Sequence, residues 1–136
     1  MKTILLIEDD TALRENTAEL LELSNYEVIT APNGKIGIQK ALQEKPDIVV
    51  CDIMMPEVDG YGVLEALAKN QHSQNVPFIF LSAKTEHKEI RKGMDLGADD
   101  YLTKPFDEEE LISAVESRLA KAKILAQNKV EPIKVE

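Results

Sequence analysis

The sequence predicts an α/β fold, with a single doubly wound, five-stranded parallel sheet and five helices. Five short apolar runs alternate along the chain with segments of helical periodicity. Several runs are continuously apolar, which is typical of strands that helices cover on both faces. Right-handed crossovers between successive strands then place all five strands parallel in one sheet.

Polar or turn residues bound each predicted strand. The strands are expected at Thr3–Ile7, Val28–Ala31, Ile48–Cys51, Phe78–Leu81 and Tyr101–Thr103. Helical spacing of apolar residues predicts helices at Thr11–Leu23, Gly34–Glu44, after Gly60, at Thr85–Gly93 and after Phe106.

Each predicted helix has an apolar face that should pack on the sheet. In the first three helices these faces comprise Leu13, Leu20 and Leu21; Ile38, Ala41 and Leu42; and Val63, Leu64 and Leu67. The fourth helix is short and polar, with Ile90 and Met94 as its apolar anchors. The fifth opens on the acids Asp107 to Glu110, which suit the positive end of a helix dipole. It then buries Leu111, Ile112, Val115 and Leu119.

The length of 136 residues and the absence of an internal repeat predict one domain, over residues 1–123. Residues 124–136 contain a proline and show no clear period, so they are expected to be a tail or the start of a linker. Cys51 lies inside an apolar run, typical of a buried strand residue in a reducing compartment. With no secretory signal or membrane-length apolar run, a cytoplasmic location is expected.

The charge of the chain bears on its partners. It has 25 acidic and 16 basic residues, for a formal net charge of −9. Such a chain should repel the phosphates of nucleic acids and anionic membranes. We therefore expect no membrane binding and no direct nucleic acid binding by this segment.

Polar residues with chemical capability follow four of the predicted strands. Glu8 and Asp9 come after the first strand, and Asp52 after the third. Ser82 follows the fourth strand, and Lys104 the fifth. Because ligands of open α/β sheets bind at the carboxyl ends of the strands, these side chains are expected to meet at one edge.

The three carboxylates need a positive partner if they meet. Two carboxylates about 4 Å apart repel by roughly 4 kcal/mol at an effective dielectric constant near 20. One Mg²⁺ and the Lys104 ammonium together balance their three negative charges, and oxygen ligands are those that Mg²⁺ prefers. A zinc site is disfavoured because Cys and His do not cluster. Each acid alone could instead serve as a helix N-cap.

Five strings in these positions resemble the receiver domains of bacterial response regulators, over roughly residues 2–123. They are LLIEDD at 5–10, PDIVVCDIMMP at 46–56, DG at 59–60, LSAK at 81–84 and GADDYLTKPF at 97–106. Their order and spacing make the match specific. We expect the flavodoxin-like fold of this family, with the strand order 2-1-3-4-5.

The resemblance also implies roles for the acidic residues. Asp52 would be the phosphoacceptor. Asp9 would bind Mg²⁺ directly, Glu8 would bind it through water, and Met54 would offer its backbone carbonyl; Mn²⁺ is a second candidate ion. The apolar side chain of Met54 is compatible with that role because only its main chain would act.

Other residues would sense the phosphoryl group. Ser82 would hydrogen-bond one phosphoryl oxygen, and Lys104 would pair with another. The Lys104–Pro105 peptide bond is expected to be cis, which would fix the direction of the lysine. Ser82 stands where the family often has threonine, which keeps the hydroxyl. Ser82 and Tyr101 would be the switch residues.

The resemblance implies a two-component response regulator and not a turnover enzyme. The phosphoryl group would come from a phosphohistidine of a sensor histidine kinase or a histidine phosphotransfer protein, and the domain would promote its own phosphorylation and dephosphorylation. The face formed by the fourth helix, fifth strand and fifth helix would signal to an output domain or partner. This face is also a candidate homodimer surface, although Ile90 and Ala114 replace arginines that winged-helix relatives use there.

Three other functional interpretations of the sequence differ in the motifs that they require. A haloacid-dehalogenase-type phosphatase needs an Asp-x-Asp-x-Thr pattern after the first strand, where this chain has Glu8, Asp10 and Ala12. A nucleotide or flavin binder is disfavoured because the segment 33–37 lacks a Gly-rich phosphate-binding pattern. An inert interaction module remains open, and retention of Mg²⁺ would distinguish it.

Overall fold

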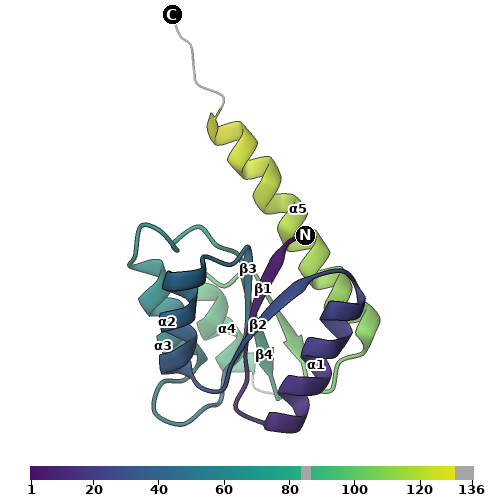
Figure 1. Ribbon diagram of the computed structural model, residues 1–136. Coiled ribbons are helices and arrows are strands. Elements are labelled where there is room, and N and C mark those ends of the chain that lie inside the picture. Colours follow the sequence, from purple (N-terminus) through teal and green to yellow (C-terminus); the bar gives the residue numbers. More distant parts are fainter. Residues whose placement is uncertain (84–86, 131–136) are drawn as a thin grey trace, which may run out of the picture.

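The computed structural model describes residues 1–83 and 87–130, and strands alternate with helices throughout them (Figure 1). The elements are β1 (Thr3–Ile7), α1 (Thr11–Leu23), β2 (Glu27–Ala31), α2 (Gly34–Glu44), β3 (Ile48–Asp52), α3 (Gly60–Ala68), β4 (Phe78–Ser82), α4 (His87–Asp95), β5 (Asp100–Thr103) and α5 (Glu108–Val130).

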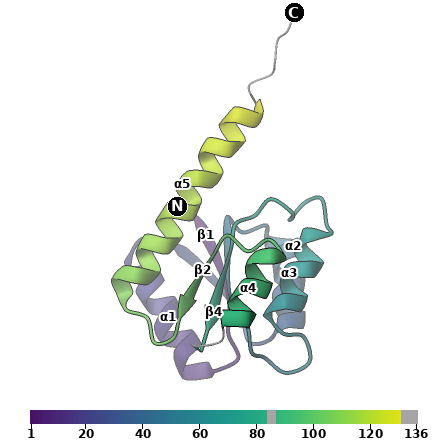
Figure 2. The same cartoon turned by 180° about the vertical axis from the view of Figure 1, so that it is seen from behind.

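The strands form one parallel sheet in the order β2-β1-β3-β4-β5, so the predicted fold and strand order are confirmed. Helices α1 and α5 cover one face, and α2, α3 and α4 cover the other (Figures 1 and 2). Four predicted strands gain one residue at an end, and β1 matches its prediction.

The core lies on both faces of the sheet. In β1, Ile4 and Leu6 pack with Leu21 of α1, whereas Leu5 and Ile7 pack on the opposite face. All four are fully buried. Two-sided burial explains why the central strands are continuously apolar, and it leaves the strand ends as the places where polar side chains can reach solvent.

In α2 the prediction of Leu42 as a core residue was wrong, because its side chain is 37% exposed. The helix buries Ala41, as predicted, together with Gly34 and Gly37. A Cβ atom at position 37 would lie 2.4 Å from Cδ1 of Ile7. The glycines let α2 approach the sheet closely, and this orientation turns Leu42 outward.

In α4 the prediction that Met94 anchors the helix in the core was also wrong, because Met94 is 40% exposed. The cause is again a close approach of the helix to the sheet at a glycine. Gly93 is buried instead, and a Cβ atom there would lie 2.6 Å from Cε2 of Phe80. Ile90 is partly buried, and the predicted start of α4 at Thr85 lies outside the described residues.

Helix α1 buries Thr17 with Leu21, whereas Leu13 and Leu20 are only partly buried. The hydroxyl-bearing Thr17 was not predicted in the core. The predicted apolar face of α3 is confirmed, since Val63, Leu64 and Leu67 are buried. Cys51 is also fully buried, as expected.

Helix α5 begins with a reciprocal capping arrangement. The backbone N–H of Glu110 donates to Oδ1 of Asp107 (2.8 Å), and the N–H of Asp107 donates to Oε1 of Glu110 (3.0 Å). Leu111 and Val115 are buried, while Ile112 and Leu119 pack at the rim of the core. The helix continues past the boundary predicted at residues 123 and 124, to Val130.

No helix in the described part of the chain is long and apolar enough to span a lipid bilayer.

The close approach of α3 to β3 gives a stability prediction. A Cβ atom at Gly60 would lie 2.5 Å from the carbonyl oxygen of Asp52 and 2.8 Å from Cα of Ile53. Because backbone cannot yield as a side chain can, Gly60→Ala is expected to lower the free energy of unfolding by about 1–3 kcal/mol in urea titrations.

The matched control is Gly62→Ala in the same helix. Its Cβ would lie 3.1 Å from Cγ1 of Val58, a side chain that can shift. Alanine also raises helix propensity by about 1 kcal/mol, so this variant should retain the stability of the native chain. Equal stability of the two variants would contradict the proposed backbone clash.

Candidate functional site

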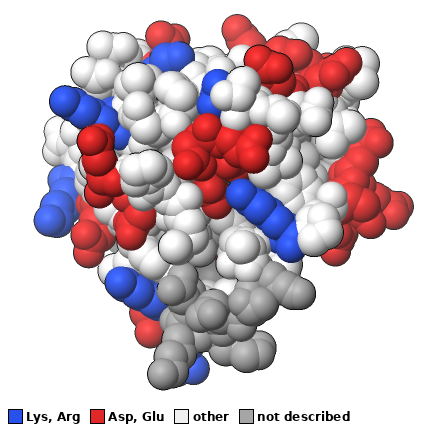
Figure 3. Space-filling model, turned by 90° about the horizontal axis from the view of Figure 1, so that it is seen from below, with Lys and Arg blue, Asp and Glu red and all other residues white. Residues whose placement is uncertain are grey.

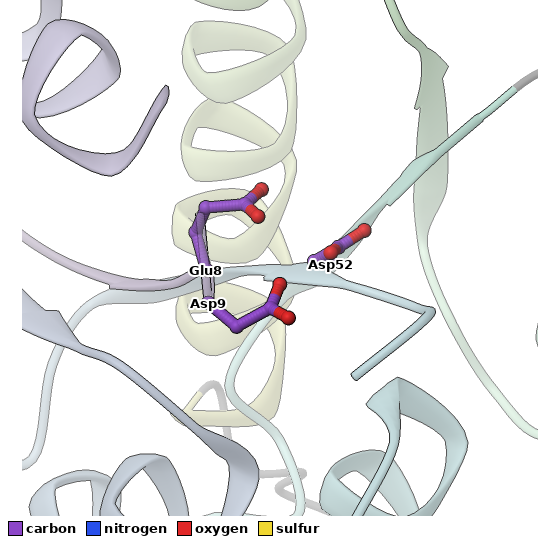
Figure 4. Close-up of side chains that lie close together, drawn as sticks. All are labelled: Glu8, Asp9 and Asp52. Atoms are coloured by element: carbon purple, nitrogen blue, oxygen red, sulfur yellow. The ribbon is translucent and has the colours of Figure 1, made fainter. Parts of the chain in front are cut away.

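Three carboxylates meet at the carboxyl edge of the sheet. The parallel register pairs Ile7 with Cys51, so Glu8 and Asp9 leave β1 beside Asp52 at the end of β3. One carboxylate oxygen from each of the three acids lies within 4.8 Å of the others. Figure 4 shows the carboxyl groups of Glu8 and Asp9 turned toward Asp52. The structure thus brings together the three acids that the sequence analysis singled out.

Lys104, which follows β5, reaches into this cluster. Its ammonium Nζ lies 3.0 Å from Oε1 of Glu8 and 3.1 Å from Oδ1 of Asp52. The backbone N–H of Lys104 donates to the carbonyl of Ser82 (2.6 Å), which ties the end of β5 to the end of β4. The Lys104–Pro105 peptide bond is cis.

Two residues that were not predicted as site residues anchor the loop after β1. Asp10 caps α1 by accepting the N–H of Leu13 (3.0 Å), and its own N–H donates to Oε2 of Glu8 (3.1 Å). Arg14 donates from Nη1 to the carbonyl of Glu8 (2.8 Å). An acid directly before a helix is a detectable N-cap signal, but the contact of Arg14 depends on how α1 is oriented in the fold.

Burial dominates the electrostatics of the acids. Glu8 is 1% exposed, and desolvation raises its pKa from 4.5 to about 7 against the opposing effects of the Asp10 N–H and Lys104. Burial also raises the pKa of Asp52; Lys104 counteracts this shift and the charge of Asp9 adds to it. Although burial alone would lower the pKa of Lys104, its contacts with Glu8 and Asp52 raise it.

These residues fit a hard divalent cation. In the part of the chain that the structure describes, Oε1 of Glu8 is buried and accepts no hydrogen bond of good geometry, and it lies 3.0 Å from the Lys104 ammonium. The donor set consists of carboxylate oxygens, with Asp9 exposed to solvent. Oxygen ligands that still admit water match the coordination of Mg²⁺.

The remaining predicted site residues lie around this cluster. Ser82 is buried at the end of β4, next to the strand that ends in Asp52. Met54 lies two residues beyond Asp52, and its side chain is 67% exposed. Tyr101 lies on the edge strand β5 and is 36% exposed, so its ring is at the surface.

The site opens on the carboxyl edge of the sheet. Seen from that end, acidic side chains gather near the middle of the surface, next to basic ones (Figure 3). A negatively charged opening of this kind attracts cations and admits a phosphoryl group only when positive charge accompanies it.

Comparison with known proteins identifies the arrangement. The family model described as "Response regulator receiver domain" matches residues 4–116. The chain belongs to this family. As a receiver domain of two-component response regulators, it is a signalling protein.

Among the relatives of this receiver domain is the "DNA-binding dual master transcriptional regulator RpaA" of Synechocystis, 37% identical over 93% of the chain and 53% of the relative. The chemotaxis protein CheY4 of Vibrio cholerae has a TM-score of 0.83 and 26% identity, over 87% of this chain and 98% of CheY4. The chain spans about half the length of the curated relatives it matches.

A third relative bears on the metal. The receiver domain of the sensor histidine kinase PA1611 from Pseudomonas aeruginosa is described with a magnesium ion coordinated in its active-site cleft. It has a TM-score of 0.82 and 25% identity, over 88% of this chain and 98% of that domain. The acidic cluster of Glu8, Asp9 and Asp52 is therefore compatible with the Mg²⁺ pocket of the family.

The raised pKa of Glu8 predicts a pH-dependent stability. Folding raises this pKa from 4.5 to about 7, so between these values the folded state binds more protons than the unfolded chain. The contribution of Glu8 is therefore full below pH 4.5 and is lost as the pH rises through 7. Glutamine does not titrate, so Glu8→Gln should remove this pH-dependent loss of stability. In EDTA, the free energy of unfolding of the variant minus that of the native chain should be larger at pH 8 than at pH 4.5.

Urea unfolding followed by circular dichroism at both pH values measures this difference. Glu15→Gln, a change of an exposed carboxylate on α1, is the control and should follow the native pH dependence. The interpretation is wrong if Glu8→Gln also follows it.

Proposed function

We propose that this receiver domain takes a phosphoryl group from a phosphohistidine of a sensor histidine kinase or a histidine phosphotransfer protein onto Asp52. The observation that carries the proposal is the position of the Asp52 carboxylate. It lies at the carboxyl edge of the sheet, 3.1 Å from the Lys104 ammonium and beside Glu8 and Asp9. At this position the Lys104 ammonium can pair with the phosphoryl group that Asp52 would receive.

The transfer is a nucleophilic substitution at phosphorus. A carboxylate oxygen of Asp52 forms the new P–O bond while the P–N bond of the phosphohistidine breaks, and the imidazole leaves with the bonding electrons. Lys104 would offset the charge of a phosphoryl oxygen, and the Ser82 hydroxyl would donate a hydrogen bond to another. Asp52 must be ionised to attack, which Lys104 favours by opposing the effect of burial.

The proposed metal ligands are Asp9 and Asp52 directly, Glu8 through water, and the backbone carbonyl of Met54. A bound Mg²⁺ would neutralise the negative charge on the phosphoryl oxygens. Mn²⁺ accepts the same oxygen ligands and would substitute for it. Lys104 already pairs with Glu8 and Asp52, so it would share these carboxylates with the ion.

Phosphorylation would shift the conformation of the domain. Charge-assisted hydrogen bonds contribute about 1.5–3 kcal/mol each, so two or three of them approach the roughly 5.5 kcal/mol that inverts a two-state equilibrium. Ser82 and Lys104 would make these bonds, and Tyr101 would turn inward from the surface. The α4-β5-α5 face would then signal to an output domain or a partner, from a cytoplasmic protein.

A hollow beside Lys104 suits the docking of the phosphoryl donor. Its volume is about 450 Å³, and it lies between α1 and the connection from β5 to α5. Leu13, Leu20 and Phe106 give it an apolar lining. A helix that carries the phosphohistidine could cover this hollow and bring its imidazole to the adjoining acidic edge.

Phosphorylation by a small donor tests the proposal. Acetyl phosphate with Mg²⁺ should add one phosphoryl group, an increase of about 80 Da in the intact mass. Asp52→Asn should abolish this increase, because an amide cannot act as the nucleophile. EDTA should abolish it in the native chain.

Asp10→Asn is the matched control, since asparagine caps a helix as well as aspartate does and Asp10 is not one of the three clustered acids. This variant should be phosphorylated like the native chain. Full labelling of Asp52→Asn would place the acceptor elsewhere. Repeated turnover of a small phosphate ester, in place of one slowly lost phosphoryl group, would instead indicate a phosphatase.

A further inference from the structure

The C-terminal half of α5 differs in charge from the rest of the chain. Residues 119–130 contain three basic residues and no acidic one, although the whole chain has a net charge of −9. The other residues therefore carry a net charge of −12. A basic helix end on an acidic protein is complementary in charge to the body of a second copy.

This half of the helix projects beyond the amino ends of the strands (Figures 1 and 2). It forms one wall of a groove of about 770 Å³, and the connections that enter β3, β4 and β5 form the other wall. The groove lies at the edge of the sheet opposite the acidic site.

The two walls of the groove carry complementary groups. On the helix wall, Lys121 supplies positive charge and Leu125 supplies apolar surface, with 57% of Leu125 exposed. Arg118 also lines the groove, but its Nε lies 3.7 Å from Oδ2 of Asp100 in the same chain, so its charge is already partnered. On the opposite wall, Asp47 and Asp99 are the acids, and Oδ1 of Asp47 also lies 4.0 Å from Nζ of Lys2. The small side chains of Ala122 and Ala126 on the helix leave room for close approach of another helix.

The acids of the opposite wall are fixed in place by the backbone. Oδ2 of Asp47 accepts the N–H of Thr3 (2.7 Å), and Oδ2 of Asp99 accepts the N–H of Phe78 (2.8 Å). Val76 and Pro77 lie between these acids as apolar wall. A cationic, apolar helix would thus meet preoriented charges and an apolar surface.

We propose that this groove is a homodimer interface in which the C-terminal half of α5 from a second copy lies. Lys121 of each copy would face Asp47 and Asp99 of the other, and Leu125 of each would pack against the apolar wall. Both complementary parts belong to one patch, as a two-fold symmetric interface requires. This interface is distinct from the α4-β5-α5 face and does not depend on the proposed phosphotransfer.

Sedimentation equilibrium of the full 136-residue chain tests the proposal. At low salt the mass should be about twice 15.2 kDa, and it should fall toward that of the monomer as salt screens the charges. Leu125→Asp should weaken the dimer by more than about tenfold, because it places a carboxylate against apolar surface and the acids of the partner.

Ile124→Asp is the matched control. Ile124 is 56% exposed on the same helix but is not part of the groove wall, so this variant should remain dimeric. Circular dichroism would verify that both variants are folded. Phosphorylation of Leu125→Asp by acetyl phosphate should persist, which separates this proposal from the function of Asp52.

A native chain that stays monomeric at low salt would overturn the proposal, as would equal weakening by the two substitutions. Binding of a monomeric native chain to phosphatidylglycerol vesicles or to duplex DNA would also overturn it, and would assign the basic helix end to a different acidic surface.

Discussion

The repulsion between Glu8, Asp9 and Asp52, and its partial relief by Lys104, is the constraint on which the chemistry of this receiver domain depends. The sheet brings the three carboxylates within 4.8 Å and buries two of them. One ammonium cannot balance three carboxylates, which leaves a net negative site that favours a hard cation. Burial raises the pKa of Glu8 to about 7, and the charge of Asp52 adds to this shift.

The apolar strands create this situation because they leave few places for polar groups. Both faces of the sheet are covered, so the charged side chains of the site are confined to the strand ends, where the parallel strands β1, β3 and β5 bring them to the same edge. Loop contacts then fix their direction: Asp10 and Arg14 hold Glu8 by its side chain and its backbone, respectively. The site is thus positioned by the sheet and oriented by α1.

The sequence was sufficient for the fold and for the four charged residues of the site, because both follow from local patterns and strand order. It was insufficient where helix orientation decides the outcome. Leu42 and Met94 were predicted inward from helical spacing, but buried glycines bring α2 and α4 so close to the sheet that these side chains turn out. The buried Thr17 and the contact of Arg14 with Glu8 escaped prediction for the same reason, since each depends on tertiary packing.

The hydrogen bond from the Lys104 N–H to the Ser82 carbonyl has a mechanical consequence. It joins the last rungs of β4 and β5 at the residues that bear the hydroxyl and the ammonium of the site. The main chain at one of these residues therefore cannot shift without straining its hydrogen bond to the other. Binding of a ligand that moves the main chain at one residue would therefore also move it at the other. The ends of β4 and β5 would then respond to the ligand together.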